Sequence, residues 1–510
     1  MANDNMEMQE DSRKLFRRLN GWLFRYHRWF GVVSCLAMIL WGASGVMHPI
    51  MSRVNPTPVN MAPPQASLEL HGALAPTEVL ARAGISEVSG LRIIGWNDAT
   101  YYQVSFSGQS GRRYFGVNSG TELVDGDVKY AEYLARHFIG DTQSKLRSVS
   151  LITQFNNDYL DINRLLPVYR VDFERDDGLH AYVETSPPRV SALADDRKIM
   201  LASLFRFMHN WEFMRNADGV RTTLISMFLA VALLSSLSGI WMYGFMWKRG
   251  TLKTQHQPLR RWHRTVGIII SLSALLFVVS AEWHLLGSKP RTVQPVVENH
   301  IPAIQLDLPD NVRHGDWGKI NLVQMEDHGA YQLQTMQEKP AASMSSGEHD
   351  HSSKPKDSQA IRQMVYVDSR SGAVLDDASR KHAVLLAKYF SGLPDDKVTQ
   401  TSQITKFEGE YGFLNKRLPV WRVEYATSDH LTYFVETATG ALASVVRDAD
   451  RAEGWSFSYL HKYHWLDFAG KDVRDFVMGL FGLGNLVIAM LGLWMFTRRY
   501  RKNGVGNVGG

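Results

Sequence analysis

The sequence contains a single cysteine, Cys35, in 510 residues. One thiol cannot form a disulfide within the chain, and it cannot supply the ligands of an iron–sulfur cluster or a thiolate zinc site. A covalently attached c-type haem is excluded as well, because the Cys-x-x-Cys-His motif needs two cysteines. The Gly-x-Gly-x-x-Gly, Walker and His-Glu-x-x-His motifs are also missing, so nicotinamide, flavin and nucleotide binding have no support in the sequence.

The sequence has little net charge, +5, and its basic residues cluster beside four long apolar runs. Lysine and arginine in such positions set the orientation of membrane helices, which explains the pattern better than nucleic-acid binding. The runs themselves carry almost no charge; the exception is Glu282, near the end of the third. The mean hydropathy of −0.20 suits a soluble protein, so the rest of the chain must form polar domains.

Each apolar run is long enough to cross a bilayer as a helix. We predict four transmembrane helices, at residues 29–50, 222–247, 265–286 and 476–496. The positive-inside rule places three basic segments in the cytoplasm, namely the N-terminus (1–28), a loop (248–264) and the C-terminal tail (497–510). The two large polar regions, 51–215 and 287–474, then lie outside, in the periplasm of a bacterium whose inner membrane holds the helices.

The two polar regions repeat each other in sequence. LLPVYRV at 165–171 matches RLPVWRV at 417–423, and YVET at 182–185 matches FVET at 434–437, both with a shift of 252 residues. Histidines in the membrane helices repeat with a shift of 236, so the second copy has gained 16 residues, which we assign to a polar insertion at 339–359. The sequence therefore predicts an internally duplicated protein, in which a helix, an outer domain and a second helix occur twice.

Each outer copy mixes helical and strand patterns. AEYLARHFIG and HAVLLAKYFSG have helical spacing of apolar residues and end in Gly140 and Gly392, the usual residue after a helix C-terminus. VYRVDF with HAYVET, and WRVEYA with LTYFVET, alternate as paired strands. We expect two small α+β domains, each with a helix on an antiparallel sheet.

Histidines recur at matched positions of the two copies. His27 and His263 stand at the cytoplasmic ends of the first and third predicted helices, and His48 and His284 follow 21 residues later in both. His209 and His461, which are 252 residues apart, precede the second and fourth helices. Because ionisable residues are rare in membrane helices, each is a functional candidate.

These features resemble the PepSY-associated transmembrane family. The resemblance rests on the motifs HRWFG at His27 and HRTVG at His263, on a Met-His or Leu-His pair ahead of the even-numbered helices, and on the two outer domains. It covers nearly the whole chain and is strongest to the FoxB-type ferric-siderophore reductases, which are di-haem inner-membrane proteins. The resemblance implies haem binding and iron reduction; the spacing alone indicates only paired membrane histidines.

On this basis we expect two haem b groups with histidine ligands. His27 and His263 would fill both axial positions of an inner haem. Arg28 and Arg264, together with Arg25, Arg260 and Arg261, are placed to pair with its propionates. The alternative is an interfacial aromatic belt with snorkelling arginines.

The outer haem has four candidate ligands for two positions: His48, His284, His209 and His461. If His48 and His284 bind it, the two irons are separated by 21 residues of helix, about 31 Å. If His209 and His461 reach into the bundle, they bind it instead. His349 and His351 in the insertion form a weaker metal-binding candidate, because no further ligands accompany them.

The sequence thus predicts an inner-membrane electron-transfer protein that reduces a ferric siderophore in the periplasm. Its electrons would come from an unidentified donor at the cytoplasmic face or from quinol. The alternative is a non-redox, membrane-anchored PepSY sensor or a module that modulates a peptidase. Matched histidines near both membrane faces favour the redox protein, because an anchor does not need them.

Overall fold

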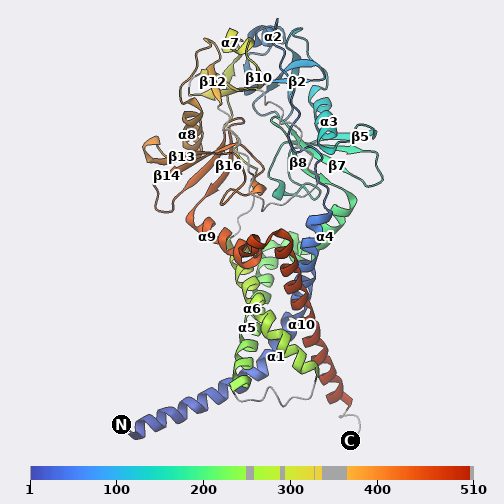
Figure 1. Ribbon diagram of the computed structural model, residues 1–510, viewed down its shortest axis with the longest axis vertical. Helices are drawn as coiled ribbons and strands as arrows, with labels where there is room; N and C mark the ends of the chain where they lie inside the picture. The colour runs from blue at the N-terminus through green and yellow to red at the C-terminus, as the bar shows by residue number, and fades with distance from the viewer. Residues whose placement is uncertain (1, 249–257, 288–292, 327, 336–363, 506–510) are drawn as a thin grey trace.

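The computed structural model describes residues 2–248, 258–287, 293–326, 328–335 and 364–505. Four long helices form a bundle at one end of the molecule (Figure 1): α1 (Ala2–Val54), α5 (Asp218–Lys248), α6 (Pro258–Gly287) and α10 (Lys471–Val505). Each is long and apolar enough to cross a membrane, as the sequence predicts for a multi-pass membrane protein. The helices extend beyond the predicted apolar runs, because polar and basic turns continue them at both ends.

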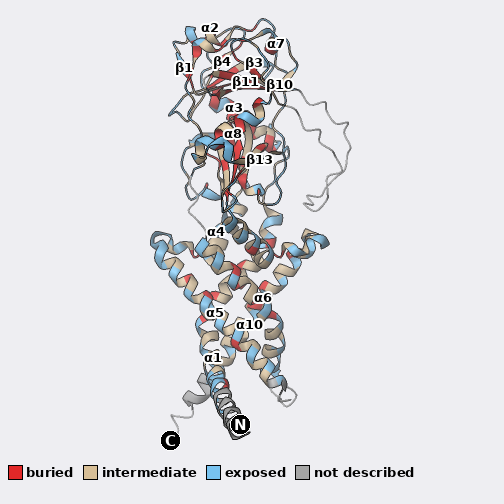
Figure 2. Ribbon diagram, turned by 90° about the vertical axis from the view of Figure 1, so that its left-hand side faces the viewer, coloured by how far each residue is buried: buried red, intermediate tan, exposed pale blue. Residues whose placement is uncertain are grey.

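The packing order of the bundle decides which side chains can meet in its interior. Both α1 and α6 pack against α5 and α10, so α1 and α6 lie at opposite corners. Helices α1 and α10 approach closely at Gly42, where a Cβ atom would lie 2.9 Å from the backbone nitrogen of Leu486. Figure 2 shows few buried residues in the bundle and many in the sheets beyond it, as expected where apolar side chains face lipid.

Two lobes of similar construction stand side by side beyond the bundle (Figure 1). In lobe 1, helix α3 (Gly126–Ile139) packs on a four-stranded antiparallel sheet of order β5-β6-β7-β8. Its strands are β5 (Leu146–Ile152), β6 (Val168–Phe173), β7 (His180–Thr185) and β8 (Pro188–Ala194). In lobe 2, helix α8 (Ala378–Ser391) packs on a sheet of order β13-β14-β15-β16. Its strands are β13 (Val398–Ile404), β14 (Val420–Tyr425), β15 (Thr432–Glu436) and β16 (Ala441–Val446).

The predicted helices and strand pairs of the lobes are confirmed. Helices α3 and α8 end at Gly140 and Gly392, which have φ angles of 73° and 69°. These angles lie in the left-handed region, where glycine avoids a steric penalty. The matched strands pair in the same register, since Arg170 faces Tyr182 and Arg422 faces Phe434.

A third sheet joins the two halves of the chain, which the sequence does not predict. Its order is β12-β11-β10-β2-β3-β4, with β2 (Gly90–Trp96) beside β10 (Trp317–Met325). The other strands are β3 (Ala99–Ser105), β4 (Arg113–Gly116), β11 (His328–Thr335) and β12 (Val365–Asp368). Strands β1 (Glu87–Val88) and β9 (Ile301–Pro302) form a second link, and the short helices α2 (Pro76–Arg82) and α7 (Asp310–Arg313) lie nearby. The polar regions are therefore one joined body and not two independent domains.

Short helices connect each lobe to the bundle. In the first half these are α4 (Asp196–His209) and the 3₁₀ helix η2 (Glu212–Ala217). In the second half they are α9 (Asp448–Ser456), the π-helix η6 (Phe457–His461) and the 3₁₀ helix η7 (His464–Ala469). The predicted insertion at 339–359, with His349 and His351, lies outside the described residues.

Candidate functional site

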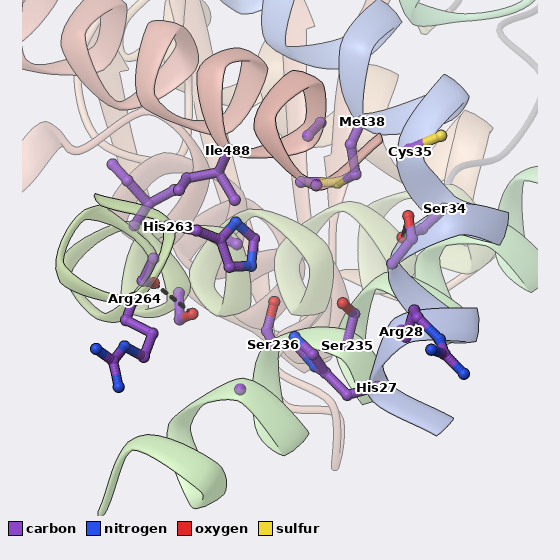
Figure 3. A pocket seen from close by; sticks show the side chains of 18 of the residues that line it. His27, Arg28, Ser34, Cys35, Met38, Ser235, Ser236, His263, Arg264 and Ile488 are labelled. Carbon is purple, nitrogen blue, oxygen red and sulfur yellow. Dashed lines mark hydrogen bonds between the residues drawn. The ribbon is translucent and has the colours of Figure 1, made fainter. Parts of the chain in front are cut away.

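A cavity of about 490 Å³ lies inside the bundle, at the end away from the lobes. All four long helices line it, and His27 and His263 extend into it from α1 and α6, at opposite corners of the bundle (Figure 3). The two histidines that the sequence pairs therefore share one cavity. The walls are mostly small or apolar, and include Gly31, Ser235, Ser271, Ala274, Ile488 and Gly492.

The hydrogen bond of His27 determines which ring nitrogen is available to a ligand. Its Nδ1 lies 2.9 Å from Oγ of Ser238. The Ser238 hydroxyl donates its hydrogen to the carbonyl oxygen of Leu234, at 2.7 Å, so Nδ1–H of His27 must be the donor. The lone pair is then on Nε2, the arrangement found in metal-binding histidines. In His263 the buried Nδ1 has no hydrogen-bond partner among the described residues.

Two glycines leave space beside these imidazole rings. A Cβ atom on Gly239 of α5 would lie 3.3 Å from Cε1 of His27, and one on Gly492 of α10 would lie 3.8 Å from Cε1 of His263. Larger side chains at these positions would press on the rings. The neighbouring helices thus keep both imidazoles accessible from the cavity.

Arginines are present at the same cavity, as predicted, but not all five. Arg28 and Arg264 line it and lie on opposite flanks in Figure 3, and Arg260 also contributes. Nε of Arg28 is buried and has no partner among the described residues. Arg25 and Arg261 are exposed and are not among the lining residues. Arg499, which the sequence analysis does not single out, joins the lining from α10.

A second pair of histidines meets at the end of the bundle that faces the lobes. His209, the last residue of α4, and His461, the last residue of η6, have ring centroids 6.3 Å apart with their planes at 85°. Nδ1 of His209 lies 2.9 Å from Oγ of Ser44, and Nδ1 of His461 lies 3.2 Å from Oγ of Ser280. Each hydroxyl donates its own hydrogen to a carbonyl of its helix, so both Nδ1–H groups donate and both Nε2 atoms keep their lone pairs.

The surroundings of this pair keep the imidazoles neutral. Burial lowers the pKa of His209 to about 4 and that of His461 to about 3. Aromatic rings pack against both, since Phe205 stacks on His209 and Phe457 on His461, with centroids 4.7 and 4.8 Å apart. Neutral imidazole is the form that binds a metal.

The other two outer candidates, His48 and His284, have different partners. His48 is exposed, and its ring lies 5.9 Å from that of Phe205. Nδ1 of His284 lies 2.5 Å from Oε1 of Glu453 in α9, and its ring stacks on Phe457. Each of them thus contacts its own half of the chain. The structure therefore brings together His209 and His461, and favours them over His48 and His284.

The donor set fits a haem better than a bare metal ion. Among the described residues, no group of three or more His, Cys, Asp or Glu side chains surrounds a common position. A haem brings four nitrogen ligands of its own, so two imidazoles suffice. His209 and His461, with ring centroids 6.3 Å apart, would supply these two imidazoles.

The serines and glycines around the imidazoles were missed by the sequence analysis. One signal was available for the outer pair, because Ser44 and Ser280 are 236 residues apart, the shift that also relates His27 to His263. The inner pair has no such signal, since the position matching Ser238 in α10 carries no hydroxyl and Nδ1 of His263 is left without a partner.

The chain was also compared with known proteins. No protein-family model matches it. No curated protein matches it either. The function is therefore argued from the geometry of the bundle and its two histidine pairs.

Proposed function

We propose that the chain is a haem b electron-transfer protein of a bacterial inner membrane, which reduces a ferric siderophore in the periplasm. Two haems would be held without covalent links, an inner one by His27 and His263 and an outer one by His209 and His461. The observation that carries the proposal is the meeting of matched histidines from the two halves of the chain at both ends of one bundle. In three of the four, a serine fixes Nδ1–H and leaves Nε2 free.

Each residue has a separate task in this proposal. A haem held by each histidine pair would supply one-electron chemistry, because its iron can be Fe(III) or Fe(II). Ser238, Ser44 and Ser280 hold the imidazoles in the tautomer and orientation that present Nε2. Arg28 and Arg264 flank the inner cavity, where they would pair with propionates. Gly239 and Gly492 keep the space beside the rings open.

The choice of His209 and His461 shortens the path between the two sites. Ser44, which holds His209, stands 17 residues after His27 on α1, whereas His48 stands 21 residues after it. At 1.5 Å per residue these separations are about 26 and 31 Å along the helix. One helical turn less favours electron transfer between the sites.

The proposed topology follows from charge. The basic ends of the helices would lie in the cytoplasm and the lobes in the periplasm. An internal duplication would explain why both halves contain the same order of elements. Electrons would enter at the inner site from a cytoplasmic donor or from quinol. Reducing Fe(III) in the chelate would weaken its binding by hard oxygen ligands and release the iron.

The experiment is electron transfer across a sealed membrane. Purified protein is reconstituted in liposomes that contain dithionite, and a ferric trihydroxamate with a colorimetric Fe(II) chelator is supplied outside. Oriented protein should produce external Fe(II), while His27→Ala and His209→Ala should each abolish it. External Fe(II) at the rate of protein-free liposomes would contradict the proposal.

A further inference from the structure

A cleft of about 900 Å³ opens in lobe 1, next to the outer histidine pair. One wall is formed by α4 and η2, and the other by the loop at residues 157–163 with the end of β8. Arg206 and Glu212 line the cleft, and each is three residues from His209. Three residues of helix rise about 4.5 Å. Arg206, which lines the cleft, is therefore about one helical turn from His209 along α4.

The helix beside the cleft and the loop that faces it are linked differently in the two lobes. In lobe 2, Nε of Arg451 in α9 lies 2.6 Å from Oε2 of Glu410, which joins the helix to the facing loop. Arg422 holds the other oxygen of Glu410 at 2.9 Å. With the 252-residue shift, Arg451 corresponds to Ile199 and Glu410 to Asp158. Isoleucine cannot bridge to a carboxylate, so α4 of lobe 1 makes no such ion pair with the facing loop at this position.

The side chains that line the cleft carry a net positive charge. Its two carboxylates are already engaged: Asp158 lies 3.2 Å from Nη1 of Arg170, and Glu212 lies 2.5 Å from Nε of Arg206. The other two cations of the lining donate their hydrogen bonds to neutral oxygen atoms, and Lys198 also interacts with the carboxylate of Asp195, which does not line the cleft. Lys198 donates to the carbonyl oxygen of Leu193, and Arg215 donates to Oδ1 of Asn157 at 2.7 Å.

Lys198 and Arg215 therefore suit a ligand with anionic oxygen atoms. An ammonium group has three N–H donors and a guanidinium has five, so both side chains keep donors for a bound molecule. Amide groups of Asn163 and Asn216 add further polar contacts, while Leu160 and Phe213 provide apolar wall. Mixed walls with a few convergent polar groups are typical of small-molecule sites.

We propose that this cleft binds the electron acceptor, an iron(III) chelate with anionic oxygen donors and a neutral or negative overall charge. The proposal rests on the proposed function for the identity of the iron, and it adds the place and the chemistry of binding. It also makes the two lobes unequal, since lobe 1 binds the chelate and lobe 2 does not. Binding involves no change of oxidation state, so a redox-inert metal can replace iron in the test.

The test measures binding of the gallium(III) complex of a linear trihydroxamate by calorimetry, with the full-length protein in phosphatidylcholine nanodiscs. Ile162→Trp fills the cleft from the loop side, away from α4, and should weaken binding at least tenfold. Lys198→Ala should weaken it about three- to tenfold. The matched control is Leu414→Trp, at the corresponding position of lobe 2, which should change the affinity by less than twofold.

Three outcomes would overturn the inference. The first is Ile162→Trp binding like the unaltered protein, the second is Leu414→Trp weakening binding equally, and the third is no binding of the complex while phosphatidylglycerol added to the nanodiscs occupies the cleft. Since gallium is not reduced, these outcomes are independent of electron transfer. A protein without haem whose gallium binding still depends on Ile162 would contradict the proposed function and leave this inference standing.

Discussion

At the residue scale, the proposed ligand roles depend on which ring nitrogen of each histidine carries the hydrogen. Serine hydroxyls accept from Nδ1–H of His27, His209 and His461 because each hydroxyl already donates to its own helix. A histidine with its Nδ1–H held in this way presents Nε2 to a metal. The ligand roles are therefore testable by substitutions that leave the helices intact.

Alanine at His27 or His263 should remove the same haem. Each imidazole is one of two axial ligands on one iron, so each variant should fall from two haems per chain to one, and the double variant should lose no more. Haem content and the absorption spectrum of the purified variants measure this. If the two single variants lost spectrally different haems, these histidines would not share a site.

The outer site gives a sharper contrast between neighbouring histidines. His209→Ala should lower the haem content from two per chain to one, because His209 faces His461 at 6.3 Å. His48→Ala is the matched control and should retain both haems, since His48 is exposed. The reverse result, with haem lost from the His48 variant alone, would assign the outer site to the helix histidines.

At the element scale, the space beside His27 in the inner cavity depends on a glycine, Gly239, in the facing helix α5. We expect Gly239→Val on α5 to displace the His27 ring, because even a Cβ atom would lie 3.3 Å from Cε1. The inner haem should be lost and the outer one retained. Gly244→Val, on the same helix with no atom within 4 Å of its added Cβ, is the control. Equal haem loss in both variants would indicate a general effect on α5.

The elements themselves were largely predictable, and their association was not. The spacing of apolar residues and the glycines after the helix ends predicted α3, α8 and the paired strands, because these patterns are local. The pairing of β2 with β10 joins residues more than 200 positions apart, and nothing in either strand specifies its partner. The choice of His209 over His48 likewise depends on how α4 meets α1, which no single segment encodes.

At the scale of the whole molecule, the two lobes are also joined by buried charges. Glu436 of lobe 2 lies 2.6 Å from both Arg189 of lobe 1 and Arg417, and the side chains of Glu436 and Arg417 are each 2% exposed. Burial alone would raise the pKa of Glu436, but the two guanidinium groups hold it at about 2. This carboxylate therefore contributes stability above its usual pKa of about 4.5 and loses that contribution as the pH falls toward 2.

Replacing Glu436 with Gln should destabilise the lobes by about 3–5 kcal/mol at pH 7, because the buried guanidinium groups of Arg189 and Arg417 then share a single carboxylate, that of Glu184. Thermal unfolding followed by circular dichroism measures the loss of stability. The difference in stability between the variant and the unaltered protein should become smaller below pH 4.5. Glu122→Gln, whose exposed pair with Arg113 is worth about 0–1 kcal/mol, is the control. A stability difference that does not change with pH would mean that the charge of Glu436 does not join the lobes.

We propose that the four-helix bundle holds two non-covalent haems between matched histidines. Pyridine haemochrome analysis of the purified protein, before and after acid–acetone extraction, tests it most directly. We predict two haem b groups per chain, all removed by extraction, because a single cysteine cannot anchor haem through a Cys-x-x-Cys-His motif. Protein without haem, or haem that stays on the polypeptide after extraction, would contradict it.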